Sequence, residues 1–239
     1  MTSSRTKRRL LFVLCGFALA LFATLGAWQV ERRTWKLGLI ARVEARVHAA
    51  PVAAPLPAAW PSLRLKDAEY RRVRAKGAWR HDQETLVDAL TARGAGYWVL
   101  TPLVSGGATI FVNRGFVPKE KADQRTRSGG QTGGAVTLTG LLRLTEPEGR
   151  FLRRNRPSEE RWYSRDVAAI AKVRGLDHVA PFFIDADATV NPAGLPIGGL
   201  TVIRFRNTHL IYALTWSLLA GLSLAGLVIL RNDDAQAQR

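Results

Sequence analysis

The chain has very little cysteine and histidine, and this scarcity excludes several classes of site. A single cysteine, Cys15, among 239 residues cannot form an intramolecular disulfide. It also excludes a Cys-x-x-Cys copper or redox site and a Cys-x-x-Cys-His haem attachment site. The four histidines, His48, His81, His178 and His209, do not have the spacing of a metal site, and no H-E-x-x-H, G-x-S-x-G or P-loop pattern occurs. We therefore do not expect an enzyme that uses side-chain catalysis.

Acidic residues are also few. The chain has 19 Asp and Glu against 35 Lys and Arg, which gives a formal net charge of +16. Hydrophobic residues make up 47% of the chain, so disorder caused by low hydrophobicity is excluded. Much of this apolar content lies in two blocks near the chain ends, and the topology must be settled before the charge can be interpreted.

Two apolar runs predict membrane spans. The segments 10–30 and 210–230 each run 21 residues without a charge, which is about 30 Å of helix. The basic tail 1–9 has no acidic residue and favours a cytoplasmic N-terminus. A cleaved signal peptide is the alternative, but the first run exceeds the usual apolar region of such peptides. We predict transmembrane helices over 10–30 and 207–230 and a second cytoplasmic tail over 231–239.

Two spans place residues 31–209 on the far side of the membrane. In a bacterium this loop is periplasmic and the membrane is the cell inner membrane; in a mitochondrion the loop faces the intermembrane space. It holds 29 basic and 17 acidic residues, a net charge of +12. Nucleic acid is absent from that compartment, so we expect no nucleic-acid partner. The charge favours anionic membrane lipids, at about 1 kcal/mol per basic residue near the surface, or alternatively an acidic protein or an anionic ligand group.

The loop divides into three segments by composition. Apolar residues at helical spacing predict that the first helix continues through 31–50, and a Pro/Ala linker over 51–62 ends it. The remainder, 63–206, is predicted to be a β-rich α+β extracytoplasmic domain. The fold class is therefore a membrane protein in which two transmembrane helices flank such a domain.

Alternation of apolar and polar residues is clear in two segments of this domain, 73–79 and 136–144, and other segments also have the composition of strands. We predict a strand over 73–79, a hairpin of 97–104 and 108–117 with a turn at 105–107, and strands over 136–144, 179–185 and 200–205. Residues 119–134 are polar and glycine-rich and are predicted to form a mobile loop. Ser164 is predicted to cap a short helix that ends near Lys172.

His209 is the most unusual ionisable residue, because it lies at the outer mouth of the second span. Asn207 or Thr208 is expected to cap that helix, and His209, Tyr212 and Trp216 fall on one helical stripe. One interpretation is an interfacial belt at headgroup level. The other is a ligand site, because neutral imidazole binds iron well and ionisable residues at a membrane edge mark sites.

Arginines close to this histidine also allow two roles. Arg204 and Arg206 lie just upstream, where they can pair with carboxylates such as haem propionates or extend toward lipid headgroups. Trp28 and Gln29, at the end of the first span, are expected at a similar depth if the helices pack.

Two further sets of polar residues are better explained by structure than by chemistry. In Asn113-Arg114-Gly115, the glycine permits a bulge or turn and Arg114 is expected to pair with a carboxylate of the domain; contact with a partner protein or a propionate is the alternative. Asp185, Asp187 and Asn191 resemble a cation loop, but the Pro192 and Gly194 beside them favour an ordinary turn.

Four stretches resemble the surfeit locus protein 1 (Surf/Shy) family, in the family's order and spacing across nearly the whole chain. They read GAWQVERRTWKLGLI (26–40), YRRVRAKGAWRHDQETLV (70–87), GYWVLTPLVSGGATIFVNRGFVP (96–118) and NTHLIYALTW (207–216). The resemblance implies an assembly factor for aa3-type cytochrome c oxidase. Such a factor binds haem a, aids its insertion into subunit I, and receives it from haem a synthase.

The resemblance also assigns residues. It implies that His209 is the proposed haem iron ligand, and that Trp28, Tyr212 and Trp216 are the family's aromatic positions. In this arrangement the three aromatic rings pack around the haem macrocycle, and the propionates face Arg204, Arg206 or Arg32. Two positions depart from the family's pattern: Ile211 stands where Gln is common, and Ser217 where Phe is common. A haem-free scaffold that stabilises immature subunit I through protein contacts is the alternative function.

Overall fold

The structure, a computed structural model, describes residues 4–150 and 152–237. The outer residues of the two predicted tails, 1–3 and 238–239, lie outside the described residues. The chain forms two compact units: a helix pair, made of the N-terminal helix as far as Arg42 and the chain from Arg204, and a domain over Val43–Ile203. Each unit is described by itself.

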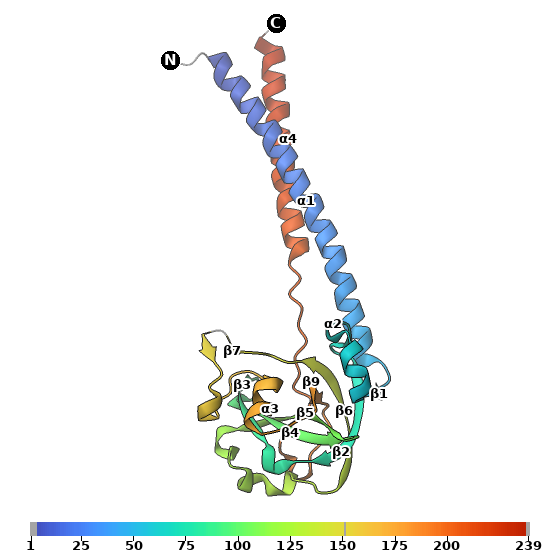
Figure 1. The fold of residues 1–239 in the computed structure, drawn as a ribbon. Helices are drawn as coiled ribbons and strands as arrows, with labels where there is room; N and C mark the ends of the chain where they lie inside the picture. The colour runs from blue at the N-terminus through green and yellow to red at the C-terminus, as the bar shows by residue number, and fades with distance from the viewer. Residues whose placement is uncertain (1–3, 151, 238–239) are drawn as a thin grey trace. The chain divides into compact units, whose positions relative to one another are not determined.

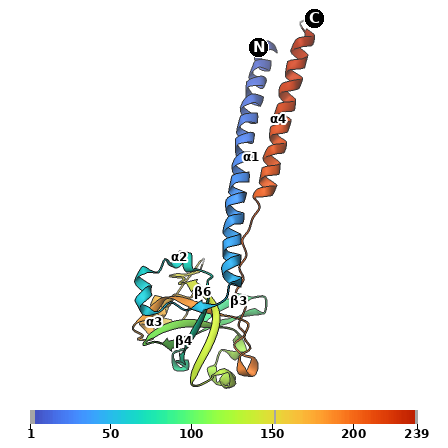
Figure 2. The same cartoon turned by 90° about the vertical axis from the view of Figure 1, so that its right-hand side faces the viewer.

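The helix pair consists of α1 (Ser4–His48) and α4 (His209–Ala237), which run side by side in opposite directions (Figures 1 and 2). Both helices are long and apolar enough to cross a membrane by length and composition. Near the chain ends, an Nη of Arg8 donates to the carbonyl of Leu230 at 2.6 Å. Small residues allow close approach further along, since a Cβ on Gly226 would lie 3.3 Å from the sulfur of Cys15.

The domain is built on a sheet that closes into a small barrel. Its strands are β2 (Arg72–Trp79), β6 (Ala135–Leu144), β9 (Val179–Ala186), β5 (Ala108–Pro118) and β4 (Gly94–Ser105), in that spatial order. The last strand meets the first, because Ala78 and Trp79 of β2 pair with Val104 and Leu103 of β4. β1 (Val52–Ala53) and β3 (Thr85–Thr91) extend the sheet at its two ends.

Short elements complete the domain. They are the α-helices α2 (Leu65–Ala68) and α3 (Val167–Val173), the hairpin of β7 (Gly149–Arg150) and β8 (Arg153–Arg154), and the 3₁₀ helices η1 (Pro57–Ser62), η2 (His81–Gln83), η3 (Lys119–Lys121), η4 (Gln124–Gly130), η5 (Pro157–Glu159) and η6 (Pro192–Gly194). The Pro/Ala segment after α1 is packed against the barrel: β1 pairs in parallel with β2, and Trp60 meets Phe182 edge-on at 6.2 Å.

Both faces of the central strands are buried, which explains their unbroken apolar runs. Alternate side chains of β9, Phe182 and Ile184, belong to one core cluster with β2 and β6. Phe183 lies in the second cluster, where Ile170 of α3 packs on the opposite face. This alternation also sends Asp185 to the face of Phe183, where it meets a polar network rather than the core.

Most predicted strands are confirmed. β2, β6, β9 and the β4–β5 hairpin match the predicted segments within a few residues, and the hairpin turns where Ser-Gly-Gly was expected. β3 was not predicted, because its polar Thr85 and Asp88 and its flanking glutamate obscure the alternation. The predicted polar loop at 119–134 contains η3 and η4 and is tied to the domain by Arg127, which is buried and pairs with Glu84.

Two local predictions are wrong. Residues 200–205 form no strand, because they pair with none of the strands in the sheet; the segment is held instead by a side-chain bond, from the hydroxyl of Thr201 to the carboxylate of Asp185 at 3.0 Å. Ser164 does not cap α3; its hydroxyl donates to the carbonyl of Glu146 at 2.6 Å. Asp166 takes the capping role, since its carboxylate accepts from the amide of Ala169 at 3.1 Å.

Candidate functional site

The helix pair brings His209 against a polar side chain of the other helix. His209 is the first residue of α4, and its Nδ1 lies 2.7 Å from Oε1 of Gln29, which is buried between the helices. With the carbonyl oxygen of Gln29 facing the ring, Nδ1 is the donor and carries the imidazole proton, because a carbonyl oxygen only accepts hydrogen bonds. The Nε2 lone pair is therefore available, and the ring is held in one orientation.

The aromatic residues expected around this histidine divide into two groups. Trp216 stacks on Phe22 of α1, with ring centroids 5.6 Å apart and planes 20° apart, so it belongs to the helix interface. Trp28 and Tyr212 are 52% and 49% exposed on the helix pair. The structure thus brings His209 and Trp216 onto the side of α4 that contacts α1, and leaves two large rings free to cover an apolar ligand.

Two predicted arginines remain open. Arg204 and Arg206 are exposed in the extended chain before α4, and neither has a hydrogen bond or ion pair within the described part of the chain. Nearby cations are engaged with rings: Arg32 lies 4.5 Å from the ring centroid of Trp35, and Lys36 lies 5.3 Å from that of Phe205. Of these four cations, only Arg204 and Arg206 have neither an ion pair nor a ring contact with a described residue.

The side chain of Asn207 does not cap α4, contrary to one of the two predicted alternatives. Its Oδ1 is buried and has no hydrogen-bond partner among the residues described. The first turn is closed instead by the backbone, where the amide of Tyr212 donates to the carbonyl of Thr208 at 3.3 Å. The side-chain oxygen of Asn207, two residues before His209, is therefore a buried hydrogen-bond acceptor without a donor among the residues described.

This arrangement has the properties of a single-histidine ligand site. Histidines that bind metals usually donate their other ring N–H to an oxygen, which fixes the tautomer and orients the ring. Gln29 supplies that oxygen to His209. Cationic guanidinium groups just before the helix and half-exposed rings beside it add the means to hold a flat apolar molecule with carboxylates on one edge.

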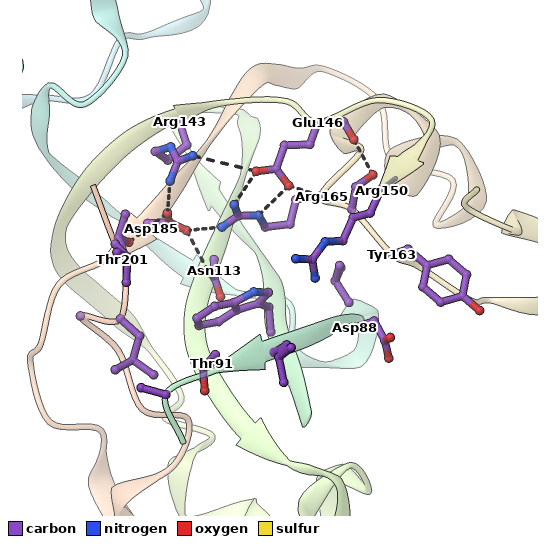
Figure 3. A pocket seen from close by; sticks show the side chains of 18 residues that line it. Asp88, Thr91, Asn113, Arg143, Glu146, Arg150, Tyr163, Arg165, Asp185 and Thr201 are labelled. Carbon is purple, nitrogen blue, oxygen red and sulfur yellow. Dashed lines mark hydrogen bonds and ion pairs between the residues drawn. The ribbon is translucent and has the colours of Figure 1, made fainter. Parts of the chain in front are cut away.

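A second polar cluster lies on the domain, around the buried carboxylate of Asp185 (Figure 3). Asp185 is 2% exposed and accepts from Asn113 at 2.7 Å and from Arg143, Arg165 and Thr201, each at 3.0 Å. All four groups line a pocket of about 450 Å³. The carboxylate is thus fully satisfied by donors from four separate segments of the chain.

These contacts overturn the cation-loop alternative and agree with the predicted turn. Each oxygen of Asp185 accepts from one guanidinium group, and Oδ1 of Asp187 closes a turn by accepting from the amide and the hydroxyl of Thr189. Within residues 4–150 and 152–237, no group of three or more potential metal-ligating side chains occurs. Burial alone would raise the pKa of Glu146, but its hydrogen bonds with Arg165 and that cation's charge outweigh burial and lower it.

Arg114 was expected to meet a carboxylate, and this is wrong. The side chain is buried, donates to the carbonyl of Gly130 and to Oδ1 of Asn191, and lies 5.1 Å from the ring centroid of Trp79. Burial lowers its pKa to about 10. The expected bulge is present: Trp98 pairs with Phe116 but Leu100 with Asn113, so Arg114 and Gly115 share one position in the ladder. Arg114 thus holds two loops to the barrel.

His81 completes this cluster. Its Nε2 lies 3.1 Å from the carbonyl of Thr132, so Nε2 carries the proton, and its Nδ1 faces Arg114 at 3.4 Å. Burial lowers the pKa of His81, and the charge of Arg114 adds to this effect. His81 is therefore a neutral structural residue rather than a free ligand.

Comparison with known proteins identifies the family. The model described as the SURF1 family matches residues 16–221, which is most of the chain. The chain belongs to the SURF1 family. Its relatives include surfeit locus protein 1 of Mus musculus, 44% identical over 209 residues, and of Homo sapiens, 42% identical over 210 residues. These matches cover 80% of this chain, 66% of the mouse protein and 68% of the human one, so the chain spans about two thirds of its relatives' length.

The resemblance found in the sequence is therefore confirmed, whereas two residues of this SURF1-family site were not assigned from sequence. Gln29 was expected only to lie at a similar depth, although its position beside Trp28 in a long apolar run marked it as a buried polar residue. Phe22 had no signal at all, because one aromatic residue in a membrane span does not differ from its neighbours. Ser217 lies beside Gly26, since a Cβ on this glycine would be 3.7 Å from the serine hydroxyl oxygen.

Proposed function

We propose that this SURF1-family chain is an assembly factor for aa3-type cytochrome c oxidase that binds haem a and aids its insertion into subunit I. The observation that carries the proposal is the hydrogen bond from His209 Nδ1 to Gln29 Oε1, which leaves Nε2 free in a fixed direction. Haem a is the cargo here, and its iron needs one such nitrogen.

The residues present fit this cargo. Trp28 and Tyr212 offer apolar surface for the macrocycle, and Arg204 and Arg206 offer unpaired guanidinium groups for the propionates. Trp216 contributes differently from the expectation: stacked on Phe22, it fixes the helix interface beside the site. A single histidine at a half-open site suits a carrier, because cargo held by one ligand is released more readily than cargo held by two.

The proposed setting is the cell inner membrane. The two apolar helices cross it, both termini lie in the cytoplasm and the basic domain lies in the periplasm, near anionic lipids, subunit I and haem a synthase. The chain needs no catalytic group for this role and is proposed not to be an enzyme.

A haem-free scaffold is the second candidate, and the contacts in the helix pair give it specific support. His209 with Gln29, and Trp216 with Phe22, are also contacts that hold two helices together. Under this alternative, the chain stabilises immature subunit I through protein contacts alone.

An optical spectrum separates the two functions. The full-length chain is co-expressed with the enzymes of haem a synthesis and purified in detergent as wild type, His209→Ala and His48→Ala. His48 is the matched control, because it is an exposed histidine at the end of α1 whose ring has Glu44 as its one polar partner among the residues described. We expect a reduced haem a band in wild type and His48→Ala, and a lost or shifted band in His209→Ala.

The opposite results are equally informative. An unchanged band in His209→Ala moves the ligand elsewhere and refutes the site. No band in any variant, with haem a synthesis active and subunit I still co-purifying, establishes the scaffold. Gln29→Ala adds a graded test, since loss of a hydrogen bond that orients a ligand typically weakens metal binding about 10–100-fold.

A further inference from the structure

The outer face of β2 carries a row of three cations that no described residue of the domain neutralises. Arg72, Arg74 and Lys76 alternate with the buried Val73 and Ala75 and point away from the core. None of the three side chains has a hydrogen bond, ion pair or ring contact with any residue that the structure describes.

The neighbouring strand supplies no counter-charge. In the β2–β6 ladder, Arg74 stands opposite Thr139 and Lys76 opposite Thr137. Figure 1 shows β1, β2 and β6 together on one side of the barrel. Like charges two residues apart on one strand face repel each other, which costs stability. Hydroxyl groups across the ladder leave the cations hydrated and available to an external anion.

A groove runs beside this row. It has a volume of about 320 Å³, and its lining combines Arg74 and Lys76 with apolar residues of the segment after α1, including Leu56 and Trp60. Leu56 is 62% exposed. The two-residue strand β1, at the end of the sheet, borders the same groove.

We propose that this groove binds an extended acidic segment of a partner protein. In an extended segment every second side chain faces the same way, with a repeat of about 6.8 Å, which equals the repeat of Arg74 and Lys76 on β2. Carboxylates at alternate positions therefore meet successive cations, while the backbone of the segment lies beside Leu56 in the same groove. This inference does not depend on haem binding.

The shape of the site favours a chain segment over a membrane surface. The cations form a single row along one strand, next to a concavity with apolar walls. A lipid surface is flat and needs a broad basic face, whereas an edge strand beside a groove is how sheets commonly bind extended peptides. Charge complementarity at such a site sets partner choice and association rate.

The test uses the full-length chain in zwitterionic-lipid nanodiscs and a labelled synthetic peptide that alternates Glu and Val. We expect the wild type to bind it and added salt to weaken binding. The double variant Arg74→Glu/Lys76→Glu is expected to bind about tenfold more weakly or worse, because two ion pairs become repulsive. The matched control is Arg125→Glu, because Arg125 of η4 is exposed and its side chain has no partner among the described residues. This variant is expected to bind the peptide like wild type.

A charge-swapped peptide that alternates Lys and Val gives the decisive comparison. It is expected to bind the double variant and not the wild type, an outcome that misfolding of the variant cannot produce. The proposal is overturned if wild type does not bind the acidic peptide, or if Arg125→Glu weakens binding as much as the double variant. Loss of binding to anionic vesicles in the double variant, with peptide binding unchanged, would assign the row to the membrane instead.

Discussion

Replacing Asp185 by asparagine removes the charge at the centre of the domain's polar network and keeps the shape of the side chain. The carboxylate is almost fully buried, and it accepts one bond each from Arg143 and Arg165. Asparagine has one acceptor oxygen in place of two, and its NH₂ group would face a donor. In the variant, one of the two guanidinium groups therefore faces an NH₂ donor instead of an acceptor. Both arginines also lose the negative charge that they share.

The size of the effect follows from these contacts. Removing one partner of a buried ion pair costs about 3–5 kcal/mol, because the other charge remains buried. Arg165 keeps a second partner, since its Nη2 lies 2.5 Å from Glu146. We therefore expect the lower part of the range, about 3 kcal/mol, for Asp185→Asn. For a chain of this size that loss lowers Tm by roughly 6–12 °C.

Thermal unfolding of the full-length chain in detergent, followed by tryptophan fluorescence, measures this loss. Trp98 lines the same pocket and reports on it directly. Asp82→Asn is the control: its carboxylate is exposed and pairs only with Arg80, so we expect a change below about 1 kcal/mol. If Asp185→Asn unfolds no earlier than the control, the network does not stabilise the domain, and the argument from burial and hydrogen bonding is wrong.

Two further predictions concern the loops held by the barrel. Gly115→Ala is expected to lower the free energy of unfolding by more than about 2 kcal/mol, because Gly115 has φ +131° and a Cβ there would overlap the backbone carbonyl of Ile197. Gly133→Ala is the control and should change Tm little, since no atom lies near its Cβ. Equal Tm values for the two variants would contradict this prediction. The lowered pKa of His81 means that the unfolded chain binds a proton more readily than the folded one, so stability is full above about pH 6.5 and falls as the pH drops through the histidine range. His81→Asn should flatten that part of the stability–pH curve, and an unchanged slope would show that another group is responsible.

Much of the fold was predictable because its signals are local. Alternation with a period of two located β2 and β6, and the glycines at 106–107 located the hairpin turn. The prediction failed for 200–205, because an extended segment becomes a strand only if folding places it beside another strand, and none of the strands that the structure describes pairs with it.

The candidate site was predictable in its members but not in their arrangement. Position at the mouth of an apolar run was enough to single out His209, and the family resemblance pointed to the aromatic residues. Which ring would face the other helix depended on helix rotation, and the structure places Trp216 there and leaves Trp28 exposed. The partner of Arg114 was missed for a similar reason, since Gly130 and Asn191 reach it from distant loops.

By itself, the sequence determined the two apolar helices, the basic β-rich domain between them, the family and the choice of His209. These depend on composition, period and short motifs, which act over a few residues. Only the tertiary structure decided the closure of the barrel, the four donors around Asp185, the contact of His209 with Gln29 and the unpaired row on β2. Each of these depends on groups far apart in the chain, and what a side chain can do is set by the partners that folding brings to it.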